Sequence, residues 1–485
     1  MPNEVIHESE TDVGWWQPVL FAAMAGGMGW GIRGQYGHET GAMIAGLLVS
    51  LTLTLLLCPR ARSLSVARAV ALATVAIGFG GTMTYGQTIG LTQNAPMIGN
   101  WEALRWGMLG LAIKGGLWIG FAGVFLGMGL GGIRYHWLEL LLLMFGVLAA
   151  CALGLYLLNS PFYPENKSLP AVYFSAHWYW EPNADIKTLK PRPEFWGGLL
   201  FALATVVAYA GWWRKDGLAL RLAGWGVLGG AIGFPLGQCL QAYHAWNVES
   251  FSEGLWAQLD PNMNWWNMME TTFGATMGAT LGLGLWLHRK RIRFVDDRDV
   301  KYLPVAVEWA ILVVHVSLLV TAEFLSFPVI EAFYDLGLII GVLPIMAVVG
   351  GRWWPYLLAL PVTLVPITGK TVRNLVYESH AINVPAGWIL YLIVPLIIAT
   401  AAAVWFKRQS DAGQTGRDFT RRALLLTTWI YFLLNFAFFR FPWPWAPWTG
   451  RTPNGIIFTI CAIGLTVLAV MTVRREVTRM PERNR

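Results

Sequence analysis

The chain has 485 residues, of which 55% are hydrophobic and only 13% are charged, and its formal net charge at pH 7 is +7. This composition, with a mean hydropathy of +0.49, lies outside the range of soluble globular proteins. Apolar stretches long enough to cross about 30 Å of hydrocarbon recur along the sequence and leave no room for a soluble domain of ordinary size. The sequence therefore predicts an all-α polytopic membrane protein.

The basic residues stand in short clusters between the apolar stretches, at residues 60–68, 214–221, 289–301, 407–422 and 474–485. Such clusters are typical of the cytoplasmic loops of membrane proteins, so we interpret them as topology signals and expect no nucleic-acid partner. They predict that both termini are cytoplasmic. The expected location is the plasma (inner) membrane, with membrane lipids as partners.

Hydropathy predicts about 14 transmembrane helices in two bundles. The expected order is a cytoplasmic tail (1–15), a membrane bundle (16–288), a basic linker (289–302), a second bundle (303–473) and a basic tail (474–485). In the first bundle, helices are expected at residues 16–32, 40–58, 66–89, 103–131, 136–158, 195–213, 218–243 and 265–287. In the second, they are expected at residues 303–325, 332–350, 353–369, 385–406, 422–440 and 455–473.

The first bundle contains a pattern that predicts helical-hairpin repeats. Gly-Gln pairs occur at 34–35, 86–87 and 237–238, and each is followed by a helix that begins with a charge and continues with small residues. These charges are Glu39, Lys114 and Glu270. A fourth helix begins with "EFWGGLLFA" without the preceding pair. Chance recurrence of a common residue is the competing explanation, and glycines four residues apart also allow close helix packing without any function.

Residues 26–41, GGMGWGIRGQYGHETG, contain the glycine spacing of a dinucleotide-binding turn at Gly29, Gly31 and Gly34. Such a turn requires a preceding β-strand and an acidic residue about 20 positions later. Here a membrane helix precedes the glycines and an apolar run follows, so the spacing predicts no cofactor site. We interpret the segment as a glycine-rich break between two helices, which is tolerated at membrane depth only inside protein or beside a water-filled cavity.

The polar residues of this break form the first candidate site. Arg33 and the backbone N–H groups of the turn could hold an anion, and Gln35 could add a hydrogen bond. His38 and Glu39 could exchange protons with a substrate. In the alternative interpretation, Glu39 only caps the second helix and Arg33 extends towards the membrane surface.

Lys114 is the second candidate, because it lies near the middle of an expected membrane helix, where an ammonium group requires a partner. The repeat places Glu39 and Glu270 at equivalent positions, so we expect these carboxylates to be the partners of Lys114. Gln87 and Gln238, from the Gly-Gln pairs, are further candidates for substrate binding. A purely structural ion pair is the alternative.

His315 and Glu323 are eight residues apart on one expected helix and are candidates for a proton relay. A histidine that is only hydrogen-bonded within the bundle is the alternative. Lys370, Arg373, Glu378 and His380 are expected in an outer loop, where they could line an entrance or be ordinary loop residues. The spacing of His, Cys, Asp and Glu predicts no metal site, and no cofactor is expected.

These features favour a multi-pass transporter (permease) for a small polar or anionic solute, with proton or cation coupling as a further expectation. The first alternative is a membrane-embedded transferase for a lipid or lipid-linked saccharide at the outer face, with His38 and Glu39 in catalysis. Two aromatic outer loops, 172–196 and 439–451, favour that alternative. The second is a non-catalytic scaffold subunit. No motif identifies a family, and self-association into a homo-oligomer is compatible with all three hypotheses.

Overall fold

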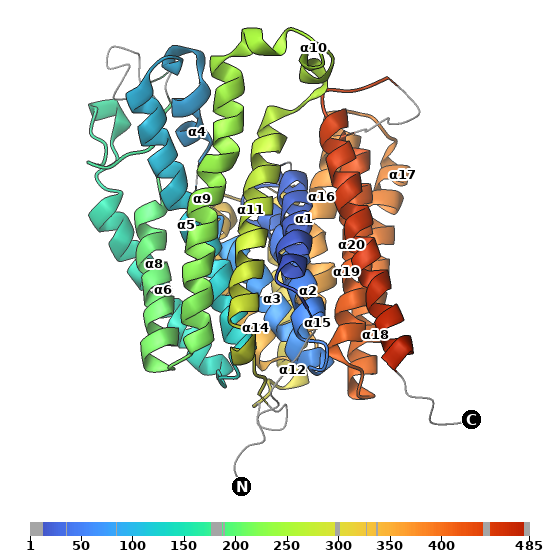
Figure 1. Ribbon diagram of the computed structural model, residues 1–485. Coiled ribbons are helices and arrows are strands. Elements are labelled where there is room, and N and C mark those ends of the chain that lie inside the picture. The colour runs from blue at the N-terminus through green and yellow to red at the C-terminus, as the bar shows by residue number, and fades with distance from the viewer. Residues whose placement is uncertain are drawn as a thin grey trace.

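The structure of the protein, a computed structural model, describes most of the chain. The described residues are 13–34, 36–83, 85–175, 187, 190–295, 301–325, 327–335, 338–439 and 447–479. In these ranges the chain is predominantly helical, and the long helices run side by side in one bundle (Figure 1). The prediction of an all-α fold is confirmed for this part of the chain.

Ten helical segments of the described residues are long and apolar enough to cross a membrane. Five belong to the first half and are α2 (Thr40–Leu57), α3 (Ser63–Gly80), α5 (Trp101–Leu130), α6 (Trp137–Leu158) and α9 (Gly217–Trp246). A sixth is α8 (Trp196–Ala208) with its π-helical continuation η3 (Tyr209–Trp213). The others are α12 (Val305–Phe324), the segments Trp354–Glu378 and Val384–Asp411, and the part Thr452–Thr472 of α20 (Thr452–Arg479).

Two of these segments are built from several consecutive helical pieces. Trp354–Glu378 consists of α15 (Trp354–Leu357), η9 (Leu358–Val362), α16 (Thr363–Val372) and η10 (Arg373–Glu378). Val384–Asp411 consists of α17 (Val384–Trp388), η11 (Ile389–Ile393) and α18 (Val394–Asp411). The first of them corrects an expectation, because Lys370, Arg373 and Glu378 lie on a continuous helical segment and not in an outer loop.

The other expected spans are also helical where they are described. They are α1 (Trp16–Arg33), α11 (Trp265–Leu287), α19 (Gly416–Phe439), and the series α13 (Pro328–Asp335), η8 (Leu338–Val342) and α14 (Leu343–Gly350). Short connecting helices are α4 (Gly86–Gln93), α10 (Trp256–Leu259), η1 (Ala95–Met97), η2 (Pro164–Asn166), η4 (Val248–Phe251), η5 (Asp260–Asn262) and η6 (Arg289–Arg291). The total of 14 spans and the hairpin repeat stay predictions.

Glycines bring three helix pairs of the first half into backbone contact. A Cβ atom on Gly274 of α11 would lie 2.1 Å from the Gly26 carbonyl oxygen of α1. In the same way, α9 meets α5 where a Cβ on Gly230 would lie 1.9 Å from the Gly115 oxygen. Helix α6 meets α8 around Gly154, where the corresponding distance to a carbonyl oxygen is 2.3 Å. No larger residue fits at these crossings, so glycine there allows the closest approach of helices.

The second half of the chain packs directly on the first. Helix α19 contacts α2 and α3, and α20 lies against α1. The start of α20 is also joined to the start of α11, because the Asn454 side chain accepts from the Asn264 backbone N–H at 2.9 Å and donates to the Asn264 oxygen at 3.1 Å. The boundary that we expect between the two bundles is therefore crossed by several contacts, and the division into two units stays a prediction.

The basic connections lie at one end of the bundle. The Gly416 N–H donates to the Ala61 oxygen at 2.6 Å, and the Arg293 N–H donates to the Leu130 oxygen at 2.8 Å. These bonds place the connections that follow α2, α5, α11 and α18 at the same level. The first and last described residues lie at this end as well, opposite α10 (Figure 1).

Two breaks in the helices lie towards the opposite end, inside the bundle. The chain leaves α1 at Arg33 and enters α2 at Thr40, and it leaves α3 at Gly80 and enters α4 at Gly86. Helix α1 has 18 residues whereas α9 has 30, and α9 continues beyond the end of α1 in Figure 1. The two breaks touch, since a Cβ on Gly81 would lie 2.4 Å from the His38 oxygen. The expected single helix 66–89 is thus wrong, because the chain turns at this close approach.

Candidate binding site

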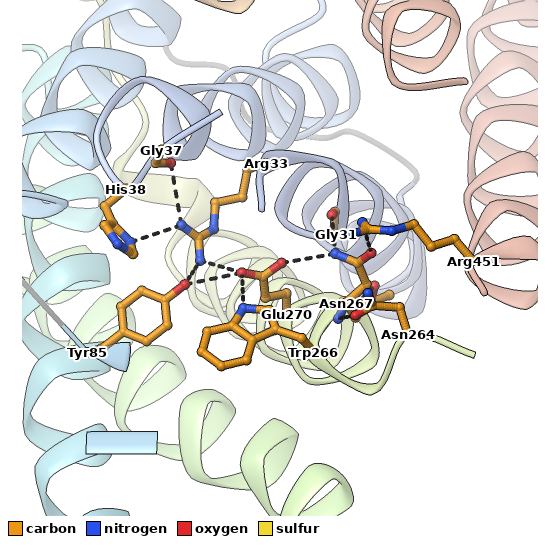
Figure 2. Close-up of polar contacts among 11 residues, drawn as sticks. Gly31, Arg33, Gly37, His38, Tyr85, Asn264, Trp266, Asn267, Glu270 and Arg451 are labelled. Carbon is orange, nitrogen blue, oxygen red and sulfur yellow. Dashed lines mark hydrogen bonds and ion pairs between the residues drawn. The ribbon is translucent and has the colours of Figure 1, made fainter. Parts of the chain in front are cut away.

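An ion pair between Arg33 and Glu270 lies at the centre of the site (Figure 2). Arg33 Nη2 is 2.7 Å from Glu270 Oε1, and the two side chains are 2% and 1% exposed. Arg33 is the last residue of α1 and Glu270 lies in the second turn of α11, so the close packing of these helices brings them together. Both residues are candidates from the sequence, but their pairing with each other is visible only in the fold.

Glu270 is surrounded by hydrogen-bond donors. Its Oε1 accepts from the Tyr85 hydroxyl at 3.1 Å and from Trp266 Nε1 at 3.0 Å, and its Oε2 accepts from Asn267 Nδ2 at 3.2 Å. Asn267 is held in turn by Arg451, whose Nη1 donates to Asn267 Oδ1 at 2.9 Å. Donors in this number stabilise a buried carboxylate in its charged form.

The guanidinium of Arg33 also contacts the break that follows α1. It donates to the Tyr85 hydroxyl, and its Nη1 lies 3.4 Å from the Gly37 oxygen and 3.3 Å from His38 Nδ1. The rings of Trp30 and Tyr85 lie 5.2 and 5.3 Å from Cζ, a distance at which aromatic faces attract a cation. Arg33 is therefore held by contacts on several sides, and its side chain lies against the break between α1 and α2.

His38 is held as a neutral imidazole. Because arginine has no acceptor atom, the contact with Arg33 requires Nδ1 of His38 to accept, which leaves the ring proton on Nε2. Burial, together with the positive charges of Arg33, Lys370 and Arg192, lowers the pKa of His38 to about 3. Three cations around a neutral imidazole create a positive potential, which attracts anions.

Lys370 brings a second cation to the break from the other half of the chain. Its Nζ donates to the Tyr36 carbonyl oxygen at 2.9 Å and to the Thr40 hydroxyl at 3.2 Å. Glu323 is a more distant partner at 3.8 Å and lies closer to Arg373, at 3.0 Å. The ammonium group of Lys370 is thus positioned by neutral oxygens of the break, with the Glu323 carboxylate as its ion-pair partner.

Glu39 faces the same point of the break as Lys370. A Cβ on Gly37 would lie 3.0 Å from Lys370 Nζ and 3.8 Å from Glu39 Oε2. Glu39 occupies the N-cap position of α2 but makes no capping hydrogen bond with its side chain. The cap interpretation is therefore limited to an interaction with the helix dipole. Gln35, the remaining candidate of this segment, lies outside the described residues.

Lys114 forms a separate buried cluster, and its expected pairing with Glu39 or Glu270 is wrong. Its Nζ is 2.6 Å from Glu194 Oε1, and both side chains are 0% exposed. Nζ also donates to Thr88 Oγ1 at 2.7 Å. Glu194 is the charge of the "EFWGG" helix start, so the repeat pattern contained a signal for it. The pairing follows from the packing of α8 beside α5, which chain order does not reveal.

The short helix α4 connects the two clusters. Tyr85, immediately before α4, contacts both Arg33 and Glu270, and Thr88 in its first turn contacts Lys114. The two ion pairs thus share one structural element. A displacement of α4 would change both of them together.

The two glutamine candidates have different surroundings. Gln238 Nε2 donates to Thr92 Oγ1 at 2.7 Å, and Gln238 is buried between α9 and α4. Gln87 instead binds backbone groups of an exposed segment, donating to the Lys190 oxygen at 2.7 Å and accepting from the Arg192 N–H at 2.9 Å. The role of both side chains in binding stays a prediction.

The candidate relay residues His315 and Glu323 make no direct contact. They are eight residues apart on α12, which corresponds to about 12 Å along the helix. His315 is buried beside the Trp354 ring, with 5.7 Å between ring centroids, whereas Glu323 pairs with Arg373. Proton transfer between them would need an intermediate group.

Several residues of the site are absent from the sequence-based set, namely Tyr85, Trp266, Asn267, Glu194 and Lys370. Two of them had a local signal, since Trp266 and Asn267 stand four and three residues before Glu270 on the same helix face. Tyr85 directly precedes a Gly-Gln pair. The sequence indicates Lys370 only as an entrance residue of a loop, because its hydrogen-bond partners at the break, Tyr36 and Thr40, are more than 300 positions away in the chain.

The two aromatic loops, 172–196 and 439–451, lie only partly within the described residues. No protein-family model, no curated protein and no solved structure matches the chain significantly.

Proposed function

We propose that the chain is a multi-pass membrane transporter that binds a small anionic solute at the break between α1 and α2. The observation that carries this proposal is the neutral His38 between Arg33 and Lys370, on non-helical backbone inside the bundle. Interrupted helices whose ends face a polar site within the membrane are characteristic of secondary transporters. Arg33 and Lys370 would attract the anion, and the Nε2–H group of His38 would donate a hydrogen bond to it.

Glu270 is the proposed coupling group. It holds Arg33 in the unloaded site, and protonation of Glu270 would weaken that ion pair and free the guanidinium for the solute. Tyr85 contacts both Arg33 and Glu270 and directly precedes α4. Loss of the ion pair would therefore also shift Tyr85 and, with it, α4. A proton on Glu270 would take the place of the Arg33 guanidinium, which would then be available to bind the anion. This exchange would couple anion uptake to proton binding.

The transferase alternative requires His38 to act as a general base. A general base needs a free lone pair, but the lone pair of Nδ1 is occupied by Arg33 and Nε2 carries the proton. Arg33 would have to move before His38 could accept a proton, so the observed geometry favours binding over catalysis. The scaffold alternative gives Arg33 and Lys370 only a structural role at the break.

The test is charge movement across proteoliposomes that contain the purified full chain, measured on a solid-supported membrane. Concentration jumps of inorganic phosphate, sulfate and acetate are the probes, each at pH 6 and pH 8. We expect a transient current for at least one anion, larger with an inward proton gradient. Arg33→Gln should reduce it at least tenfold, and Lys370→Met should raise the half-saturating concentration at least threefold.

Arg105→Gln is the matched control, because Arg105 is an exposed cation on α5 whose removal changes the net charge equally. It should leave the current within twofold of the unmodified protein. Symport of one proton with a monovalent anion carries no net charge, so acidification of the lumen is followed with an enclosed pH-sensitive dye beside the current. Absence of both a current and anion-dependent acidification for all probes, or equal losses in Arg33→Gln and Arg105→Gln, would contradict anion transport through this site. Hydrolysis or transfer on a lipid-linked substrate without any current would instead support the transferase.

A further inference from the structure

A basic pocket lies at the end of the bundle opposite the break, where α5 ends and α9 begins. Its volume is about 180 Å³, and its walls include Lys215, Arg291, Arg293 and Ile133. The chain segment after α11 forms one wall, because the Arg293 N–H is bonded to the last carbonyl of α5 at 2.8 Å. Two parts of the sequence thus bring three cations to one pocket, Lys215 before α9 and Arg291 and Arg293 after α11.

The three cations have no anionic partner among the described residues. Lys215, Arg291 and Arg293 are exposed, and their side chains make neither an ion pair nor a hydrogen bond in the described part of the chain. A cluster of like charges is unfavourable in the absence of a counter-ion. An anion in the pocket would remove this repulsion.

The one carboxylate in the pocket wall does not neutralise them. Asp216 is buried, and its Oδ1 accepts from the Leu218 and Ala219 N–H groups at 3.1 and 2.9 Å. Its Oδ2 accepts from the Tyr135 hydroxyl at 2.9 Å. Oδ1 of Asp216 thus caps α9 and Oδ2 binds Tyr135, and with three cations against this one carboxylate the pocket stays positive overall.

Neighbouring side chains place the pocket at the depth of lipid headgroups. Trp212 and Trp213, directly before the turn that leads to Lys215, are 79% and 78% exposed. Exposed tryptophans at helix ends are typical of the boundary between hydrocarbon and headgroups. Leu220 and Leu287, 41% and 47% exposed, provide apolar surface on α9 and α11 for acyl chains next to the pocket.

From this combination we infer that the pocket binds a phosphate group, supplied by an anionic phospholipid of the surrounding membrane. Lys215, Arg291 and Arg293 contact the phosphate, and the acyl chains run along α9 and α11. This site is separate from the anion site at the break and does not depend on the proposed transport. Free inorganic phosphate shares the recognition chemistry and is the other source of the same group.

Native mass spectrometry of the full-length protein in non-ionic detergent tests the inference. The probes are phosphatidylglycerol and phosphatidylcholine with identical acyl chains, titrated separately. We expect at least tenfold tighter binding of phosphatidylglycerol. Each of Arg291→Gln and Lys215→Gln should weaken it about fivefold, which corresponds to the loss of one cation near a charged lipid surface.

Lys290→Gln is the matched control, because Lys290 is the exposed neighbour of Arg291 and lies outside the pocket wall. It should change the affinity less than twofold. Displacement of phosphatidylglycerol by 10 mM inorganic phosphate would identify the free ion as a sufficient ligand, and its retention would identify the lipid; both support the site. Equal binding of the two lipids, or an equal loss in Lys290→Gln and Arg291→Gln, would overturn it.

Discussion

At the scale of single residues, the protein holds several charged groups inside an apolar bundle by ion pairs that are supported by neutral donors. Arg33 and Glu270 form one such pair, and Lys114 and Glu194 form another. Burial of an isolated charge is strongly unfavourable, and hydrogen bonds to the remaining atoms are needed to offset it. The two pairs differ in their surroundings, since only the first borders the break between α1 and α2.

The Lys114 pair leads to a stability prediction. Lys114→Met leaves the Glu194 carboxylate buried without its cation and should lower the free energy of unfolding by about 3 to 5 kcal/mol. The double variant Lys114→Met with Glu194→Gln should be more stable than Lys114→Met alone, because the double variant has no unpaired carboxylate at position 194. Unfolding in mixed micelles measures both. A double variant that is less stable than the single one would show that Lys114 does not act mainly as the partner of Glu194.

His38 leads to a prediction of pH dependence. Its pKa of about 3 in the folded protein lies below the usual value of 6.5, so between these pH values the unfolded chain binds a proton that the folded chain does not. Stability should therefore rise with pH in this window and be lost as the pH falls, by at most about 1.4 kcal/mol per pH unit from this group. His38→Gln should flatten the dependence of the unfolding midpoint on pH between 4 and 6.5. An unchanged slope would mean that His38 titrates normally.

At the scale of helices, glycine decides which elements can meet. The helix pairs α1 with α11 and α5 with α9 approach so closely that a single added carbon would collide with the opposite backbone. These crossings also set the register that places Arg33 beside Glu270. Glycines of the predicted hairpin repeat therefore have a packing role whether or not the repeat is real.

A pair of substitutions on one helix tests this role. Gly230→Ala on α9 places a Cβ 1.9 Å from a backbone oxygen of α5, whereas the exposed Gly224 of the same helix has nothing within 4 Å of that position. Gly230→Ala should destabilise the protein by about 3 kcal/mol, because the helices must separate. Gly224→Ala should be neutral or stabilise it by up to about 1 kcal/mol, since alanine favours helix. Similar unfolding midpoints for the two variants would contradict the observed packing.

At the scale of the whole molecule, the basic connections and both described ends of the chain gather at one end of the bundle, while the break between α1 and α2 lies towards the other. This separation fits the expectation that the basic end faces the cytoplasm. The solute site would then open outward, and the phosphate pocket would face the inner leaflet, where anionic lipids are common.

Cysteine labelling in intact cells checks this orientation. A cysteine at Glu253, next to α10, should react with a membrane-impermeant maleimide, and a cysteine at Lys290 should react only after the cells are opened. Both positions are exposed in the structure, so accessibility depends on the side of the membrane alone. Labelling of the unmodified protein, which contains four cysteines, gives the background. The reverse pattern would place the basic end outside.

Hydropathy and length were enough to predict an all-α chain with apolar helices of membrane-spanning length and the position of most of those helices. Residues 265–287 were expected as a helix and form α11, and the expected 103–131 differs from α5 by two residues at its start and one at its end. Hydropathy and length are properties of a continuous stretch, so they can be read without knowledge of the fold. Arg33, Glu270 and Lys114 were recognisable for a similar reason, because a charge within or beside an apolar run is unusual wherever it points.

Which of these charges meet depends on how the helices pack. The pairing of Lys114 with Glu194, the approach of Lys370 to the break, and the turn after Gly80 all depend on which helices are neighbours and at what register. Those contacts join positions from about 40 to more than 300 residues apart, and no local pattern encodes them. Backbone contact at glycine crossings fixes the register of the helices, and the register in turn selects the partner of each buried charge.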